Sequence, residues 1–347
     1  METINPTDNC FNFIRLYACI NVLLYHIGWF MAVKVPVLSS LVNPINGVPV
    51  FFLISGFLIW LSIGRTKDFK SFCIKRVLRL YPELWFSIII EVVCLLLFYE
   101  GIDIDDYLQM IILQSTVFPN HTPAAFDSYG IGSLNISLWT IPIIIQFYIS
   151  IWFLYKWLDK KTIREWIIVM LLSIVCGVII ELKLLNFLPV IIELKLLNFL
   201  PAIVNKVIGL SILSYLWMFL FGSFVAKFFS VIMPFLVNYW YVSLIALAIN
   251  ELYPFSVVIV PYTLIGSVLL ACSIFGIAYR FKKIKIKHDV SYAIYLYHML
   301  FVNVAIQIGY RGNVMAVVII IALSFIFAYF STMAVDKFYK KIKLKAI

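Results

Sequence analysis

Apolar runs of about twenty residues recur along the whole chain, and this repetition constrains the fold more than any other feature. A helix of that length rises about 30 Å, which matches the hydrocarbon layer of a bilayer. Hydrophobic residues make up 64% of the chain and charged residues 13%, with a mean hydropathy of +1.03, unlike any soluble globular domain. The runs are too long for the alternating strands of an outer-membrane barrel. The sequence therefore predicts an all-α polytopic membrane protein.

We predict ten transmembrane helices, near residues 10–33, 45–64, 83–100, 138–157, 166–185, 207–226, 233–250, 256–279, 290–309 and 314–335. With Met1 in the cytoplasm, all but five of the 27 Lys and Arg residues lie on the cytoplasmic side. Cytoplasmic loops are enriched in these residues, so we predict that both termini are cytoplasmic. We expect residues 1–347 to form a single integral-membrane domain. The five Lys and Arg residues that this orientation places on the outward side are Lys34, Lys183, Lys195, Lys206 and Arg311.

Three further features set limits on the class of protein. The net charge of +10 follows from the cytoplasmic loops and does not indicate nucleic-acid binding. The start of the chain lacks a signal-peptide pattern, and the six cysteines show no paired spacing, so we expect no cleaved leader, disulfide framework or metal site. The twelve residues 178–189 are repeated at 190–201, which we interpret as a local duplication in an outward loop because repeat architectures need more units.

The first span carries two groups that a bilayer disfavours, Arg15 and His26. They are eleven residues apart, so they share a helix face and lie roughly 16 Å apart along its axis. Ionisable residues in a span are costly and usually face a partner or a cavity. Taken singly, Arg15 is explained by a side chain that reaches the headgroups, and His26 by a hydrogen-bonded interior histidine. The pair on one face suggests a site that extends from the membrane surface into its interior.

Two more groups of residues are candidates for chemistry. A basic run in the predicted loop before the third span contains Lys75, Arg76 and Arg79. Such a run is explained by topology or by anionic lipid, but it also suits nucleotide phosphates, which guanidinium groups bind in a bidentate fork. Within the third span, Glu91 is either a protonated, packed carboxyl group or an orienting partner for His26 or His298.

Five segments, in order, resemble the membrane-bound acyltransferase-3 family, the bacterial O-acetylases of cell-surface polysaccharides. They are Arg15-x10-His26, the run FFLISGFLI, the basic run with Arg76-x2-Arg79 before Pro82, the segment SLWTIP…QFY with Trp139, Gln146 and Tyr148, and SYAIYLYH with Tyr297 and His298. The resemblance covers roughly residues 10–310.

The resemblance implies transfer of an acyl group, most simply acetyl, from cytoplasmic acyl-CoA to a hydroxyl of an extracytoplasmic glycan. Acetyl-CoA would be a substrate, with no permanently bound cofactor, and the location would be the bacterial cytoplasmic membrane. Lys75, Arg76 and Arg79 would hold the nucleotide phosphates, and Arg15 would lie along the pantetheine arm. His26 would act as the general base or carry the acyl group itself, and we favour the base.

One position departs from the family pattern. The acidic residue usual between the Pro and the Gln of the fourth-span segment is Ile144 here. Either the acid is dispensable, or Glu91 replaces it, or this copy is catalytically impaired. A proton-coupled transporter that uses Arg15, His26 and Glu91 is the rival class, although the two halves of the chain lack the repeat symmetry that many transporters have.

Overall fold

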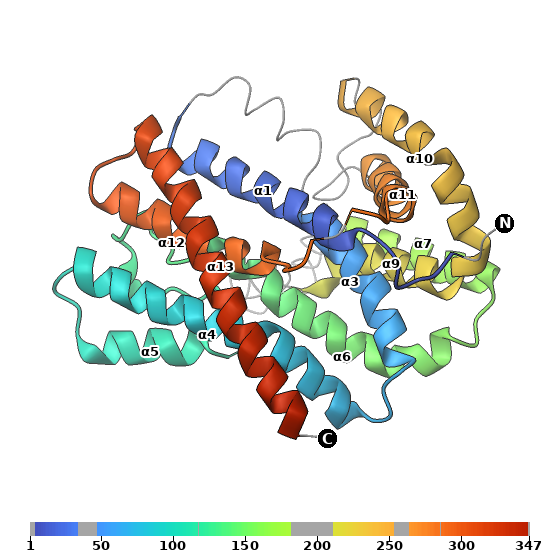
Figure 1. The fold of residues 1–347 in the computed structure, drawn as a ribbon, viewed down its shortest axis with the longest axis horizontal. Helices are drawn as coiled ribbons and strands as arrows, with labels where there is room; N and C mark the ends of the chain where they lie inside the picture. The colour runs from blue at the N-terminus through green and yellow to red at the C-terminus, as the bar shows by residue number, and fades with distance from the viewer. Residues whose placement is uncertain are drawn as a thin grey trace, which may run out of the picture. The chain divides into compact units, whose positions relative to one another are not determined.

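The computed structural model describes residues 4–33, 47–116, 118–181, 211–252, 264–284 and 286–345. Within these ranges every regular element is a helix, which confirms the all-α prediction for them (Figure 1). The chain divides into two compact units. Unit 1 comprises Met1–Ile14, Val48–Thr66 and Ile143–Lys285, and unit 2 comprises Arg15–Gly47, Lys67–Pro142 and Ile286–Ile347.

Six of the described helices are long and apolar enough to cross a membrane. They are α1 (Phe11–Phe30), α4 (Phe69–Phe98), α6 (Thr140–Leu158) with the turn before it, α7 (Ile163–Glu181), α10 (Phe229–Leu252) and α13 (Val314–Lys345). The predicted spans 45–64, 207–226 and 256–279 contain shorter apolar helices, α3 (Gly47–Ile63), α9 (Leu216–Lys227) and α11 (Leu264–Arg280). The ninth corresponds to α12 (Ser291–Gln307). The chain is a multi-pass membrane protein, and the count of ten spans and the orientation stay predictions.

The prediction that the basic run precedes the third span as a loop is wrong. Helix α4 begins at Phe69, so the run and the span form one continuous helix that includes Pro82. The start is fixed by Asp68, whose side chain accepts a hydrogen bond from the backbone N–H of Ser71 at 2.8 Å. An N-terminal cap of this kind satisfies a donor that the helix leaves open. Lys75, Arg76 and Arg79 are therefore held on a rigid element.

In unit 1, close packing of α3 on α9 depends on two glycines. A Cβ at Gly56 would lie 2.0 Å from the backbone oxygen of Phe219, and a Cβ at Gly222 would lie 2.0 Å from that of Leu53. The hydroxyl of Ser223 donates to the Gly56 carbonyl at 3.1 Å. Small residues let helix backbones approach closely in a membrane. Gly56 and Gly222 therefore permit the close packing of α3 on α9.

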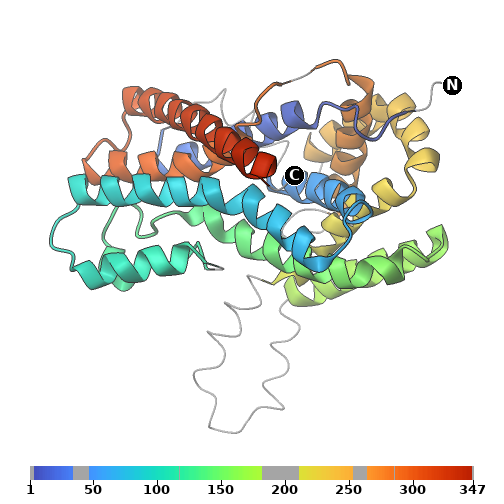
Figure 2. The same ribbon diagram turned by 60° about the horizontal axis from the view of Figure 1, so that its bottom comes forward.

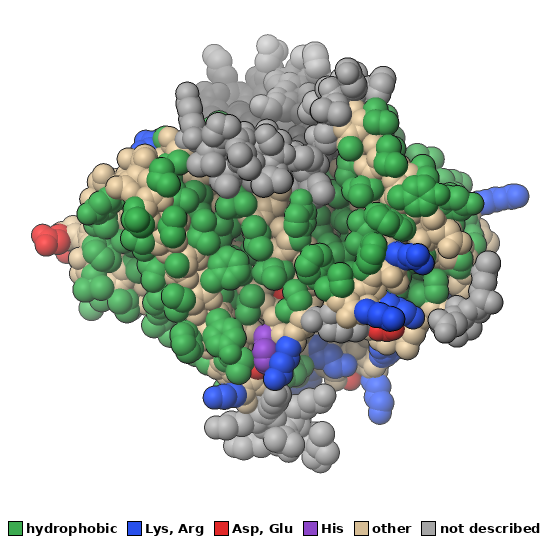
Figure 3. Space-filling view, turned by 45° about the horizontal axis from the view of Figure 1, so that its top comes forward, with side chains coloured by type: hydrophobic (Ala, Val, Ile, Leu, Met, Phe, Trp, Pro, Cys, Tyr) green, Lys and Arg blue, Asp and Glu red, His purple; other side chains and the backbone are tan. Residues whose placement is uncertain are grey.

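In unit 2, α12 is buried along most of its length and packs against α4 and α13. Helix α5 (Ile104–Gln114), which lies in the long segment predicted as an outward loop, runs beside α4 (Figures 1 and 2). Exposed side chains on these helices are mostly hydrophobic, as lipid contact requires (Figure 3). On α13 they include Val314, Met315, Val318, Ile319 and Phe330.

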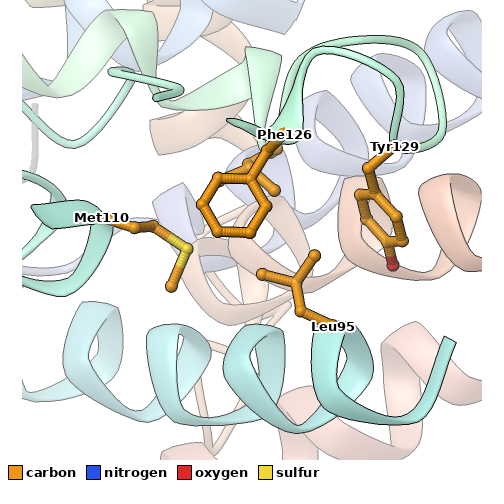
Figure 4. Packing of buried hydrophobic residues seen from close by; sticks show 5 residues of the cluster. Leu95, Met110, Phe126 and Tyr129 are labelled. Carbon is orange, nitrogen blue, oxygen red and sulfur yellow. The ribbon is translucent and has the colours of Figure 1, made fainter. Parts of the chain in front are cut away.

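Beneath α5, a buried cluster joins it to α4 and to the loop that follows (Figure 4). Its members are Leu95, Met110, Phe126, Tyr129 and Leu134, each at most 2% exposed. The loop that follows α5 is held against α12 by Asn303. The side-chain amide of this residue donates hydrogen bonds to the carbonyl oxygens of Ser133 and Leu134 at 2.9 and 2.7 Å. These contacts hold the loop that leads to α6.

The loop lies close to α12 at Gly130, which has a φ of +59°. A Cβ there would lie 2.3 Å from Oδ1 of Asn303, so only glycine fits both the backbone and the space. Of the predicted duplication at 178–201, only its first residues belong to α7, and the rest lies outside the described residues.

Candidate functional site

The two histidines predicted from α1 and α12 lie in direct contact within unit 2. Nδ1 of His26 is 2.8 Å from Nε2 of His298. The ring planes differ by 8° and their centroids are 5.1 Å apart, so the rings meet through nitrogen-bearing edges. His298 is fully buried, whereas His26 is half-buried. The pair thus consists of one fully buried imidazole and one that is partly exposed.

The hydrogen bonds around His298 define how the protons are placed. Nδ1 of His298 is 3.1 Å from the carbonyl oxygen of Ile294, which only accepts, so Nδ1 carries the proton. In the neutral ring Nε2 then has a lone pair, and it accepts from Nδ1 of His26. This leaves Nε2 of His26 without a proton. That nitrogen is the basic atom of the pair.

Asp289 joins the predicted residues Arg15 and Arg79. Its Oδ2 atom lies 3.0 Å from Nη1 of Arg15 and 3.2 Å from Nη2 of Arg79. Its Oδ1 atom accepts from the backbone N–H of Ser291 at 3.2 Å and from the Ser291 hydroxyl. The aspartate therefore connects α1 and α4 to the first turn of α12.

Burial raises the pKa of the Asp289 carboxyl group, but the Arg15 and Arg79 guanidinium groups and the hydrogen bonds from Ser291 together outweigh it. The pKa lies below its ordinary value as a result, and the group is ionised at neutral pH. The sequence patterns described above do not single out Asp289 as a site residue. The available signal was an acid at the end of a basic run, directly before the predicted ninth span.

The remaining basic residues of α4 have different environments. Lys75 is exposed, and Arg79 has a side chain that is 53% exposed although it contacts Asp289. The Arg76 guanidinium lies over the ring of Phe72, 5.4 Å from its centroid. Two of the three predicted phosphate-binding cations are thus accessible from solvent or headgroups.

Glu91 is not joined to the histidines. It is 3% exposed, and its Oε1 atom has no hydrogen-bond partner. Among the described residues, no hydrogen bond or ion pair connects it to His26 or His298. The structure thus gives no contact between Glu91 and the histidines that would support an orienting role.

The other predicted residues fall in both units. In unit 2, Trp139 is half-buried in the short helix η2 (Ile136–Trp139), and Tyr297 is buried with its ring centroid 6.0 Å from that of Phe327. In unit 1, Gln146 and Tyr148 are half-buried on α6, and Oε1 of Gln146 accepts from the backbone N–H of Ile212 at 3.1 Å. Among the described residues, no group of three His, Cys, Asp or Glu side chains is arranged to hold a metal ion.

The sequence profile of the acyltransferase domain, acyltransferase-3 type, matches residues 8–333. The chain belongs to this acyltransferase family. It is 29% identical over 158 residues to nodulation protein 10 of Rhizobium leguminosarum bv. viciae, which covers 41% of this chain and 43% of the relative. It is 28% identical over 150 residues to the peptidoglycan O-acetyltransferase OatA of Listeria monocytogenes, which covers 40% of this chain and 22% of the relative.

The matched parts therefore span less than half of these curated relatives. No solved structure matches the chain. Position 144 is informative because the resemblance to the family implies an acid there, whereas Ile144 is apolar. Ile144 is half-buried on α6 in unit 1, and it brings no charge to that helix.

Proposed function

We propose that this protein is a membrane-bound O-acyltransferase that moves an acetyl group from cytoplasmic acetyl-CoA to a hydroxyl of a cell-surface glycan. Family membership supports the reaction class, and the name of the Listeria relative supports an acetyl group and a peptidoglycan-type acceptor. The helices and the family together support a location in the bacterial cytoplasmic membrane. One observation carries the mechanism, which is the hydrogen-bonded pair of His26 and His298.

In the proposed reaction, Nε2 of His26 takes the proton of the acceptor hydroxyl as the oxygen attacks the thioester carbonyl. A C–O bond forms, the C–S bond breaks, and the proton passes from His26 to the departing thiolate of coenzyme A. An imidazole can both accept and donate a proton, so a histidine suits both steps. While His26 is protonated, its Nδ1–H donates to His298, whose own proton is held by the Ile294 carbonyl. His298 therefore fixes the reactive tautomer of His26.

The donor end of the site is proposed at the basic face of α4. Lys75 and Arg76, with Arg79, supply cations for the phosphates of the nucleotide, and Arg15 lies on α1, eleven residues before His26. The fork of a guanidinium group matches phosphate oxygens in geometry as well as in charge. Trp139 offers an aromatic face on which a sugar of the acceptor is expected to stack.

The test is acetyl transfer by the purified protein in proteoliposomes. Release of coenzyme A is followed with acetyl-CoA, first without an acceptor and then with peptidoglycan fragments. Wild type is compared with His26→Ala and with His121→Ala, a histidine substitution outside the pair. With the peptidoglycan fragments present, we expect release of coenzyme A by wild type and by His121→Ala, and no release above background by His26→Ala. Equal release by all three variants contradicts the proposal.

The same preparation distinguishes the two chemical roles of His26. A covalent acetyl-imidazole would leave radiolabel on the protein after a brief incubation with labelled acetyl-CoA and no acceptor. We expect no such label, because a general base never carries the acyl group. Stable label that disappears on addition of the acceptor would assign the covalent route.

A further inference from the structure

Asp289 uses its two carboxylate oxygens for two different tasks. Oδ1 accepts hydrogen bonds from Ser291 at the start of α12, so the carboxylate is fixed to that helix. Oδ2 contacts Arg15 on α1 and Arg79 on α4. The Arg15 and Asp289 side chains are only 17% and 11% exposed, so their interaction is shielded from water more than a surface ion pair would be.

This ion pair lies a similar distance from the histidine pair along both helices. From Arg15 to His26 α1 advances eleven residues, which is roughly 16 Å. From Asp289 to His298 the chain advances nine residues, which is roughly 13 Å at helical rise. The two helices are therefore joined at one level by an ion pair and about three turns further on by the two imidazoles. A rotation or slide of α1 against α12 at the ion pair would displace His26 from Nε2 of His298.

We propose that Asp289 is a positioning residue, which holds α1 against α12 in the register that lets His26 donate its hydrogen bond to His298. The Arg15 contact carries this role, because it is the one that joins Asp289 to the helix of His26. Arg79, with its more exposed side chain, adds a second anchor on α4. The catalytic consequence rests on the function proposed above, whereas the geometric claim stands apart from it.

The test measures the histidine pair directly. The chain has four histidines, so 15N labelling of histidine gives a small set of imidazole signals in solid-state NMR of the protein in lipid bilayers. The signals are assigned with His26→Gln and His298→Gln. In wild type, a correlation across the N–H···N hydrogen bond should join Nδ1 of His26 to Nε2 of His298. In Asp289→Asn we expect this correlation to fall to less than half of its wild-type intensity.

Two matched variants separate the ion pair from other effects. Asp336→Asn removes a carboxylate of the same unit that lies 3.3 Å from Nδ1 of His288, and it should leave the correlation unchanged. Ser291→Ala removes the hydroxyl that donates to Oδ1 but keeps both arginine contacts, and it should also leave the correlation in place. If Asp289→Asn does not fold, Arg15→Gln breaks the same ion pair from α1 and is expected to weaken the correlation equally.

A full-intensity correlation in folded Asp289→Asn overturns the proposal. The kinetic counterpart is a fall in kcat of at least tenfold with no rise in KM for acetyl-CoA, since the substitution removes an anion that competes with phosphate for Arg79. A rise in KM with unchanged kcat would also contradict the positioning role. If no variant, wild type included, transfers acetyl groups, the proposed function fails while the NMR comparison still decides the geometry.

Discussion

Nδ1 of His26 lies 2.8 Å from Nε2 of His298, although 272 residues separate them in the chain. Because the Ile294 carbonyl fixes the proton on the far side of His298, the direction of this hydrogen bond is determined. The basic nitrogen is then Nε2 of His26.

The substitution His26→Ala should abolish acetyl transfer and leave the protein folded. General acid–base catalysis typically contributes about 10²–10⁴ to a rate, so a loss of at least that size is expected. The measurement is turnover per mole of monodisperse protein, with His121→Ala as the control. Wild-type turnover in His26→Ala would remove His26 from the mechanism.

Substitution of His298 should lower kcat more than it weakens binding of the acetyl donor. His298→Ala removes the acceptor for the Nδ1–H of His26, so the reactive tautomer is no longer selected, and kcat should fall at least tenfold with KM for acetyl-CoA nearly constant. His298→Gln keeps a side-chain oxygen that accepts this hydrogen bond, and it should recover part of the rate. Steady-state kinetics of both variants checks this, and equal losses in the two would argue for a packing effect alone.

Arg76→Ala and Arg79→Ala should raise KM for acetyl-CoA and affect use of the glycan less. A lost hydrogen bond to a charged group is worth about 1.5–3 kcal/mol, which corresponds to roughly one to two decades in affinity. Lys70→Ala provides a control, since Lys70 is an exposed cation on the same helix α4. Unchanged KM in both arginine variants would place the donor phosphates elsewhere.

The ion pair of Asp289 should make stability depend on acid. The pKa of Asp289 in the folded protein is lower than its ordinary value of about 3.9. The stabilisation by the ionised carboxylate is therefore fully present above about pH 4–5, and it is lost as the pH falls through the lower, folded-state pKa. Thermal unfolding of wild type and Asp289→Asn should differ most near neutral pH, and the gap in Tm should close in strong acid. A gap that is constant with pH would show that charge is not the cause.

The sequence predicted the helices far better than it predicted the partners of their polar groups. Spans of apolar residues locate a helix locally, without any knowledge of the residues that it faces. The partner of Arg15 is 274 residues away, and that of Arg79 is 210 residues away, so neither follows from spacing along one helix. Asp289 was therefore missed, although both arginines were selected.

Glu91 shows a second limit of prediction from the sequence, because here a selected residue does not contact its expected partner. The sequence correctly marked a buried carboxyl group within a span, but it could not show which way the side chain faces. In the structure, the Oε1 atom of Glu91 has no hydrogen-bond partner, and the two histidines form a hydrogen bond with each other. An acid on the right span therefore does not by itself identify an orienting partner.

The last prediction concerns the apolar residue at position 144. If the family's acid contributes to catalysis, Ile144→Glu should increase turnover, because it restores the carboxylate that the family pattern has at this position. If His298 already fixes the tautomer of His26, the added carboxylate should bring no gain and should lower expression, since a charge within a span costs about 2.5–3.5 kcal/mol on insertion scales. We expect the second result, because the histidine pair is complete without an acid. Turnover and yield of Ile144→Glu are measured beside Ile144→Gln, which adds a polar group of similar size without the charge.

Glu91→Gln completes this comparison. A strong loss in Glu91→Gln with no gain in Ile144→Glu would show that Glu91 replaces the missing acid, despite its lack of contact with the histidines. A gain in Ile144→Glu alone would mark this chain as an impaired member of its family. We expect little change in turnover from either substitution. This outcome would mean that the imidazole of His298 holds the base in its reactive tautomer. A carboxylate has that role in a Ser-His-Asp triad.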